Sequence, residues 1–230
     1  MLLQILTYTH HLTTMLFGIF LSAFFLGVKQ NKKNVCILLG GGAVSGLFFL
    51  ICNTVFGSLF TEAVYPIFVH LPLFLLLVFY YRFRWLPSII SIMTAYLCCQ
   101  FSNWAGIFAL SLSGLDWVYY LVRIIVTVAV FAFLSRYLCQ TTALLFAKSD
   151  RELYILGAMP FVYYVFDYST TKFSMLLYSG NKVVVEFLAF AMCISYVIFL
   201  FVYFQEYELK NRAEQYGQLT NMQLNSLHSE

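Results

Sequence analysis

The stretch 183-VVVEFLAFAMCISYVIFLFVYF-204 runs directly into 205-QEYELKNRAEQYGQLTNMQLNSLHSE-230, and this change of character decides the fold. A helix of about 20 apolar residues crosses the hydrocarbon core of a bilayer, and 183–204 has that length. The segment that follows is rich in Gln, Glu and Asn and has only a sparse apolar stripe. We therefore expect a membrane helix that continues into a polar helix outside the bilayer.

Six more apolar stretches of similar length precede this one, at 5–28, 34–56, 64–81, 86–110, 117–135 and 152–171. The chain is 62% hydrophobic and only 10% charged, which lies far outside the range of soluble proteins. The stretches are apolar all round, whereas the strands of a membrane barrel alternate polar and apolar residues. We predict an all-α polytopic membrane protein with about seven transmembrane helices over 1–204 and a coiled-coil-like linker helix over 205–230. The least regular span is 152–171, because it contains Pro160 and Asp167.

The basic residues predict the orientation of these spans. Ten of the 13 fall in alternate loops or in the tail, and these ten are Lys29, Lys32, Lys33, Arg82, Arg84, Arg136, Lys148, Arg151, Lys210 and Arg212. The other loops hold only Lys172 and Lys182. The positive-inside rule then places the N-terminus outside and the tail in the cytoplasm of a bacterial cell membrane. The start of the chain has neither a basic n-region nor a small-residue cleavage site, so we expect no removable signal peptide.

Strongly polar residues inside the predicted spans all lie in the outer half. The candidate ligand-binding residues are His70, Gln100, Asn103, Arg123, Asp167 and Glu186. Arg123 lies about 9 Å below the outer end of its span and Asp167 about 24 Å above the inner end of its own. This similar depth predicts an Arg123–Asp167 ion pair in a hydrated cavity that is open to the outside and binds an extracellular ligand.

Two other interpretations of these polar residues stay open. They can be helix-end residues that reach the interface, with a purely structural charge pair. They can also line a proton or ion pathway, but such a pathway needs polar groups in the inner half, where the sequence has almost none.

The tail carries a weak coiled-coil pattern. Residues at alternating spacings of four and three are Leu209, Ala213, Tyr216, Thr220, Gln223 and Leu227, of which only Leu209, Ala213, Tyr216 and Leu227 are even partly apolar. Gly217 weakens the helix further, by about 1 kcal/mol relative to Ala. A marginal seam of this kind can change register when a membrane domain changes state. We predict that these four residues transmit a signal in a homodimer; the alternative is a solvated helix with no partner.

No catalytic, metal-binding or nucleic-acid-binding pattern is present in the sequence. There is no P-loop, GxSxG or HExxH motif, and the tail has one Lys and one Arg against four Glu. The six cysteines have no metal-ligand spacing and suit buried apolar positions, although the vicinal Cys98–Cys99 pair leaves a redox role open. We expect no catalytic residue, metal or cofactor in this chain.

Three stretches and the tail carry a resemblance to a known family. The stretches are 64-VYPIFVHLPLFLLLVFYYRFRW-85, 88-SIISIMTAYLCCQFSNW-104 and 160-PFVYYVFDYSTTKFSMLLYSG-180. With the helix from Phe204 onward, they resemble the membrane sensor region of Firmicute histidine kinases of the GHKL class, which are related to Agr-type peptide-pheromone receptor kinases.

The resemblance implies a sensor that receives an extracellular small molecule or peptide. It also implies a cytoplasmic kinase domain, which this chain lacks, together with the ATP and Mg²⁺ of that domain and a response regulator as its partner. The chain would then be a sensor truncated just before its kinase, with no catalytic domain of its own. The alternative is a small membrane transporter or substrate-binding membrane component, which should show internal repeats or broken helices at the midplane.

Overall fold

The computed structural model describes residues 2–57, 60, 64, 66–173 and 182–228, and every regular element in these ranges is helical. The elements are α1 (Leu2–Phe25), α2 (Lys32–Phe56), η1 (Pro66–His70), α4 (Leu71–Leu75), η2 (Leu76–Tyr80), α5 (Trp85–Cys98), α6 (Gln100–Ser113), α7 (Asp116–Tyr137), α8 (Cys139–Phe146), α9 (Asp150–Phe173) and α10 (Lys182–His228). The prediction of an all-α fold is confirmed, and each predicted span contains helix.

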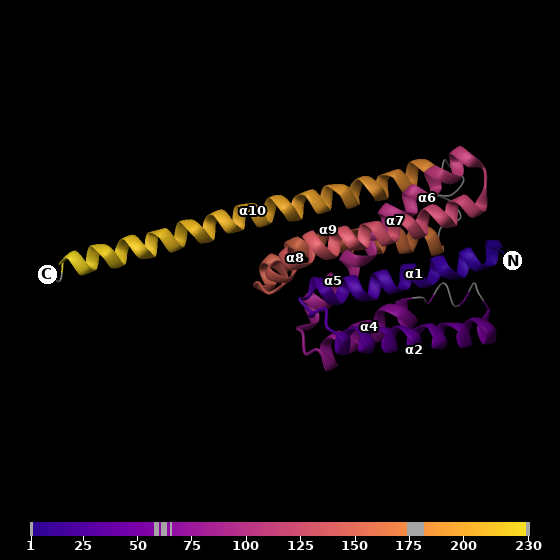
Figure 1. Ribbon diagram of the computed structural model, residues 1–230, viewed down its shortest axis with the longest axis horizontal. Helices are drawn as coiled ribbons and strands as arrows, with labels where there is room; N and C mark the ends of the chain where they lie inside the picture. Colours follow the sequence, from indigo (N-terminus) through magenta and orange to yellow (C-terminus); the bar gives the residue numbers. More distant parts are fainter. Residues whose placement is uncertain (1, 58–59, 61–63, 65, 174–181, 229–230) are drawn as a thin grey trace.

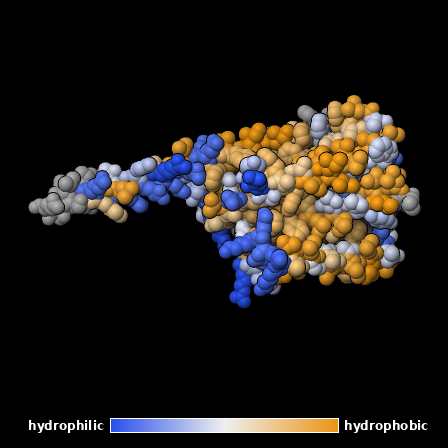
Figure 2. Space-filling view, viewed as in Figure 1, coloured by the Kyte–Doolittle hydropathy of each residue, from blue (hydrophilic) through white to orange (hydrophobic). Residues whose placement is uncertain are grey.

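Among the described residues, four helical segments are long and apolar enough to cross a membrane. They are α2, the segment Trp85–Ser113 that joins α5 and α6, α7, and Leu188–Gln223 within α10. The segment Pro66–Tyr80 is too short, and α9 begins with charged residues and contains Asp167. Large apolar side chains are exposed on the surface, among them Val44 of α2 at 71% and Phe79 of η2 at 74%. A surface of this kind is compatible with a lipid environment, and Figure 2 shows it over most of the body.

The helices pack around α5 and α6, which form the most buried segment of the four. Helices α1, α7, α9 and α10 contact this central pair, and the segment Pro66–Tyr80 contacts α5 through α4 and η2. Helix α2 packs against α1 and against Pro66–Tyr80 (Figure 1). The core consists of aliphatic and aromatic side chains, including fully buried Phe25, Leu97, Leu153 and Leu200. The helices therefore enclose one large apolar core, and a smaller apolar cluster of Cys52, Phe68 and Val69 lies between α2 and η1.

Small residues let neighbouring helices approach closely, as is usual in membrane bundles. A Cβ on Gly157 of α9 would lie 2.6 Å from the Ile90 side chain of α5, so only glycine fits there. The Ser91 hydroxyl of α5 donates to the carbonyl of Ser22 in α1. These contacts fix α5 against both α9 and α1.

Two helices depart from the uninterrupted spans that the sequence predicts. The stretch 86–110 is divided at Cys99, where α5 ends and α6 begins. The stretch 64–81 contains π-type turns on both sides of α4, near Pro66 and Pro72, which lack the amide N–H that a regular helix needs. The expected loop at 136–151 was also wrong in part, since it holds α8.

Helix α10 is a single helix of 47 residues, about 70 Å long at the usual rise per residue. Its first half packs on the body, and its second half projects from one end, opposite the end where the N-terminus lies (Figure 1). Hydrophilic residues gather on the projecting part and on the adjoining end of the body (Figure 2). Gly217 lies inside this helix without interrupting it.

Candidate functional site

His70 lies at the end of the first π-type turn, where the backbone is already irregular. Its Nδ1 is 2.8 Å from the hydroxyl of Tyr164 in α9. The His70 ring also packs edge-on against Tyr96 of α5, with ring centroids 5.7 Å apart. Irregular π-type turns often occur at functional sites, because they aim a side chain away from the helical repeat. Here the turn directs His70 between two other helices.

Asp167 joins this group from α9. The Tyr96 hydroxyl donates a hydrogen bond to Asp167 Oδ2, and the Tyr96 and Tyr164 rings meet at 5.0 Å. We call His70, Tyr96, Tyr164 and Asp167 the tyrosine–aspartate cluster. Its members come from three helices and carry hydroxyl, imidazole and carboxylate groups. The cluster can therefore hold a polar ligand group or relay a proton between neighbouring members.

The two tyrosines of this cluster are absent from the residues predicted from sequence. Tyr164 precedes Asp167 by three residues, so both lie on one face of α9. This spacing was the available signal. No such signal exists for Tyr96, because only the packing of α5 on α9 brings it to the carboxylate.

Gln100 and Asn103 form a local pair in the first turn of α6. The Asn103 side-chain amide donates to Gln100 Oε1 at 3.2 Å, and Gln100 is 6% exposed. The pair lies directly after the helix break at Cys99. Amides buried in an apolar bundle need such partners, because an unpaired amide is costly there.

Arg123 of α7 lies in a second place, against α6. Its Nη1 donates to the hydroxyl of Tyr119, and its stem crosses Gly106, where a Cβ would lie only 2.4 Å from Arg123 Cγ. No ion pair joins Arg123 and Asp167 among the residues that the structure describes, so the predicted pair was wrong. Equal depth gives the height of a residue in the bundle but not the direction in which its helix faces.

The six residues predicted from sequence therefore do not converge on one cavity within the described ranges. His70 and Asp167 share the tyrosine–aspartate cluster, Gln100 pairs with Asn103, and Arg123 lies on α6. The side chain of Glu186 lies outside the described part of the chain.

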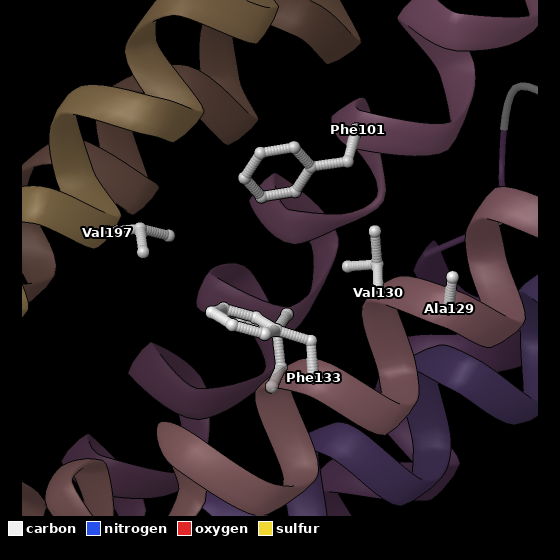
Figure 3. A pocket seen from close by; sticks show the side chains of 6 residues that line it. Phe101, Ala129, Val130, Phe133 and Val197 are labelled. Carbon is white, nitrogen blue, oxygen red and sulfur yellow. The ribbon is translucent and has the colours of Figure 1, made fainter.

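An apolar groove of about 260 Å³ lies elsewhere, between α6, α7 and α10 (Figure 3). Its lining residues are Phe101, Ala129, Val130, Phe133, Leu134 and Val197. None of these side chains offers a hydrogen-bonding group, and none belongs to the predicted ligand site. The groove therefore has no means of recognising a polar ligand.

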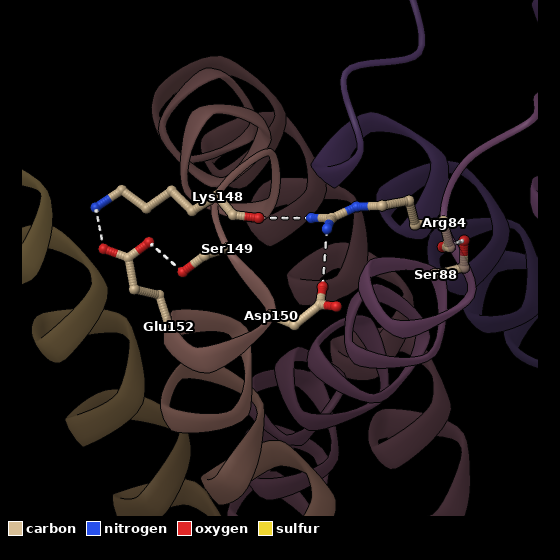
Figure 4. Close-up of polar contacts among 6 residues, drawn as sticks. All are labelled: Arg84, Ser88, Lys148, Ser149, Asp150 and Glu152. Atoms are coloured by element: carbon tan, nitrogen blue, oxygen red, sulfur yellow. Dashed lines mark hydrogen bonds and ion pairs between the residues drawn. The ribbon is translucent and has the colours of Figure 1, made fainter.

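The segment that joins α8 to the start of α9 makes polar contacts with Arg84, which directly precedes α5 (Figure 4). Lys148 of this segment also contacts α10. Arg84 pairs with Asp150 at 2.8 Å and also donates to the carbonyl of Lys148. The Lys148 ammonium lies 3.4 Å from Glu152 Oε1, 3.5 Å from the ring centroid of Tyr207 and 4.9 Å from that of Tyr203. We call Lys148, Glu152, Tyr203 and Tyr207 the lysine junction. It holds α10 at the point where the helix leaves the body.

The burial of the Lys148 side chain and its charge both stabilise the lysine junction. The Lys148 side chain is only 9% exposed, so its charge interacts with the two rings in partly dry surroundings. Glu152 accepts a hydrogen bond from the Lys148 ammonium and another from the Ser149 hydroxyl. Ser149 and Glu152 also have the spacing of a capping box at the start of α9. That motif is a sequence signal for the helix start, whereas the contact with α10 has none.

A second, buried contact joins α10 to α9. Pro160 of α9 has no N–H, so the carbonyl of Leu156 loses its helical donor. The hydroxyl of Tyr196 in α10 donates to this carbonyl at 2.9 Å, and Tyr196 is 1% exposed. Although the sequence suggests that Pro160 could break the span, α9 runs through it.

The predicted transmission residues Leu209, Ala213 and Tyr216 lie on the projecting half of α10 with exposed side chains. Leu209 is 66% exposed and Tyr216 70%, so no described part of the chain covers the apolar stripe. Leu227 belongs to the same helix, but its side chain lies outside the described part.

The cysteines and metal-binding residue types add no second site within the described ranges. All six cysteines, including Cys98 and Cys99, are free thiols. No group of three or more His, Cys, Asp or Glu residues in that part of the chain is placed to hold a metal ion.

No protein-family model, curated protein or solved structure matches this chain.

Proposed function

We propose that this chain is the membrane sensor module of a two-component histidine kinase. It receives an extracellular small molecule or peptide at its outer polar residues and passes the change through α10 to a cytoplasmic kinase domain. All seven helical stretches cross the membrane in this proposal, with the N-terminus outside and the tail inside. The chain works as a homodimer whose tails pair through Leu209, Ala213, Tyr216 and Leu227.

The observation that carries the proposal is the continuity of α10. The same helix contains the fully buried Cys193, Tyr196 and Leu200 and, without a break, the exposed Leu209 and Tyr216. A continuous helix is stiff along its axis, so a shift or rotation inside the body reaches the tail. A flexible tether would instead absorb such a movement.

The distribution of charge supports the proposed orientation. Exposed Lys29, Arg82, Arg84 and Arg136 lie in or beside the connections at the end of the body from which α10 projects. Basic loops favour the cytoplasmic side. That end is therefore the cytoplasmic one in our proposal, which places the tail where a kinase domain would act.

The proposal predicts that output depends on the helical phase of α10. The chain is fused through Glu230 to the dimerisation and catalytic core of a histidine kinase, and ATP-dependent autophosphorylation is measured in membranes. One residue inserted after Phe204 rotates the tail by about 100°, while seven residues nearly restore its phase. We expect the one-residue insertion to change basal autophosphorylation several-fold and the seven-residue insertion to leave it near the unmodified level.

Each insertion is the control for the other. The seven-residue insertion lengthens the helix more than the one-residue insertion but changes its helical phase less. Equal output from both fusions and the unmodified one would contradict the proposal. That result would favour a free-standing binding or transport module with an uncoupled tail.

A further inference from the structure

Arg123 is held in a fixed place by neighbouring helices. It lies seven residues after the start of α7, about 10 Å along the helix axis. Its stem occupies the space that Gly106 leaves on α6, since an added Cβ would meet Arg123 Cγ at 2.4 Å and Cδ at 2.8 Å. The Arg123 Cζ lies 5.1 Å from the ring centroid of Tyr119. An arginine whose side chain only extended to the membrane interface would not require a glycine on the neighbouring helix. The close packing on Gly106 therefore indicates a fixed position for the Arg123 side chain.

The hydrogen bonds of Arg123 leave one edge of its guanidinium unused. Nη1 donates to the Tyr119 hydroxyl, but the buried Nε has no acceptor, and Nη2 has none among the described residues. The Nε–Nη2 edge presents two parallel N–H donors. This is the geometry that binds both oxygens of a carboxylate or phosphate at once.

The charge of Arg123 is also uncompensated in the described part of the chain. His10 of α1 and Cys99 lie close enough to interact with it electrostatically, but a neutral imidazole and a neutral thiol do not balance its charge. No described carboxylate lies within ion-pair distance of Arg123. A lone positive charge within a membrane bundle is costly, so an anion that neutralises it binds there favourably.

We propose that Arg123 binds an oxyanion, a carboxylate or phosphate, through its Nε–Nη2 edge. The anion belongs either to an anionic lipid headgroup of the outer leaflet or to a soluble ligand, and both sources share this chemistry. The inference rests on the outer ligand site of the proposed function and names the class of group bound there. Gly106 and Tyr119 are positioning residues in this site.

The experiment measures binding to the full chain in a phosphate-free maltoside detergent, followed as the shift of its thermal unfolding midpoint. The lipid arm compares phosphatidylglycerol with a diacylglycerol of the same chains, which lacks the phosphate. The soluble arm compares inorganic phosphate with chloride at equal ionic strength. We expect stabilisation by the phosphate-bearing probe in at least one arm, and the responding arm assigns the source.

Three variants locate the binding. Arg123→Gln removes the charge, Arg123→Lys keeps the charge but loses the paired donors, and Arg136→Gln is the control. Arg136 lies on the same helix, with its Cζ 5.9 Å from the ring centroid of Tyr137. We expect Arg123→Gln to weaken binding about 10- to 100-fold, Arg123→Lys to weaken it less, and Arg136→Gln to leave it unchanged. If Arg123→Gln does not fold, the comparison of Arg123→Lys with the wild type decides.

No midpoint shift in either arm, or an equal shift in the wild type and both Arg123 variants, would overturn the inference. The assay needs no kinase output. Loss of this inference would therefore leave the phase experiment, and the sensor proposal with it, standing.

Discussion

Pro160 of α9 leaves a backbone carbonyl without its helical donor, and Tyr196 of α10 supplies a hydrogen bond to that carbonyl. The carbonyl is that of Leu156, which has no helical donor because Pro160 lacks an N–H. The Tyr196 hydroxyl lies 2.9 Å from that carbonyl. A buried carbonyl without a donor is costly in an apolar bundle, so this bond joins α10 to α9 as well as completing α9.

This pairing predicts a thermodynamic coupling. Tyr196→Phe should lower the free energy of unfolding in detergent by about 0.6–1.7 kcal/mol, the range of hydrogen bonds between membrane helices. In a Pro160→Ala background the N–H returns to Leu156, so the same Tyr196→Phe change should cost little. Denaturation of all four variants by sodium dodecyl sulfate gives the coupling energy.

Tyr203→Phe is the matched control, because Tyr203 lies on the same helix and its ring, rather than its hydroxyl, makes the described contact with Lys148. It should change stability little. Equal losses from Tyr196→Phe in the two backgrounds would show that the hydroxyl does not compensate for the proline.

Individual residues mark the limit of what the sequence could predict here. Charge and polarity made Arg123 and Asp167 candidate site residues, and their predicted depths came from counting helical rise. The residues that they contact could not be predicted from the sequence. Tyr96 and Gly106 contact them because of the way α5 and α6 are rotated toward their neighbours. Rotation of a helix about its axis is a property of packing, and apolar-all-round membrane helices carry no stripe that reveals it.

At the scale of elements, the lysine junction ties α10 to the rest of the body. Lys148 reaches from the connection between α8 and α9 to two rings on α10, one helical turn apart. Its partner Glu152 lies on α9, so movement of α9 changes the position of the ammonium. The junction therefore links α9 to the tail.

We predict that loss of the junction loosens α10 where it leaves the body. Lys148→Met keeps the apolar stem but removes the charge, and Tyr207→Leu removes the ring. Each should raise hydrogen exchange at the amides of residues 203–212 about two- to fivefold, as expected from a cation–π contact of about 0.5–1 kcal/mol. Mass spectrometry of the chain in nanodiscs measures this exchange.

Two controls separate the junction from general damage. Tyr207→Phe keeps the ring and should exchange like the wild type. Lys210→Met removes an exposed charge on the same helix and should also have little effect. Fast exchange in Tyr207→Phe, or normal exchange in Lys148→Met, would rule out a cation–π contact as the cause.

The sequence predicted which stretches are helical far better than it predicted where those helices end or are interrupted. The length of the apolar stretches predicted helices, and continuous apolar runs predicted α7 and α9 to within two residues at each end. The sequence missed α8 and the break at Cys99, because neither is marked by proline or glycine. The tail was correctly predicted as helix, although Gly217 argued against its length.

At the scale of the whole molecule, one end differs chemically from the other. The end from which α10 projects carries exposed basic residues and the lysine junction, and the N-terminus lies at the opposite end (Figure 1, Figure 2). In the proposed topology, an odd number of membrane crossings places these two ends on opposite sides. In our proposal, this arrangement carries an external signal to a cytoplasmic tail.

The sidedness of the two ends tests this central claim most directly. Single cysteines at Leu3, Lys32, Arg82 and Thr220 are placed in a cysteine-free chain and labelled with a membrane-impermeant maleimide in intact cells. The account predicts labelling at position 3 from outside, and labelling at 32, 82 and 220 only after the cells are opened. Labelling of position 220 in intact cells, or of 3 and 220 from the same side, would contradict it.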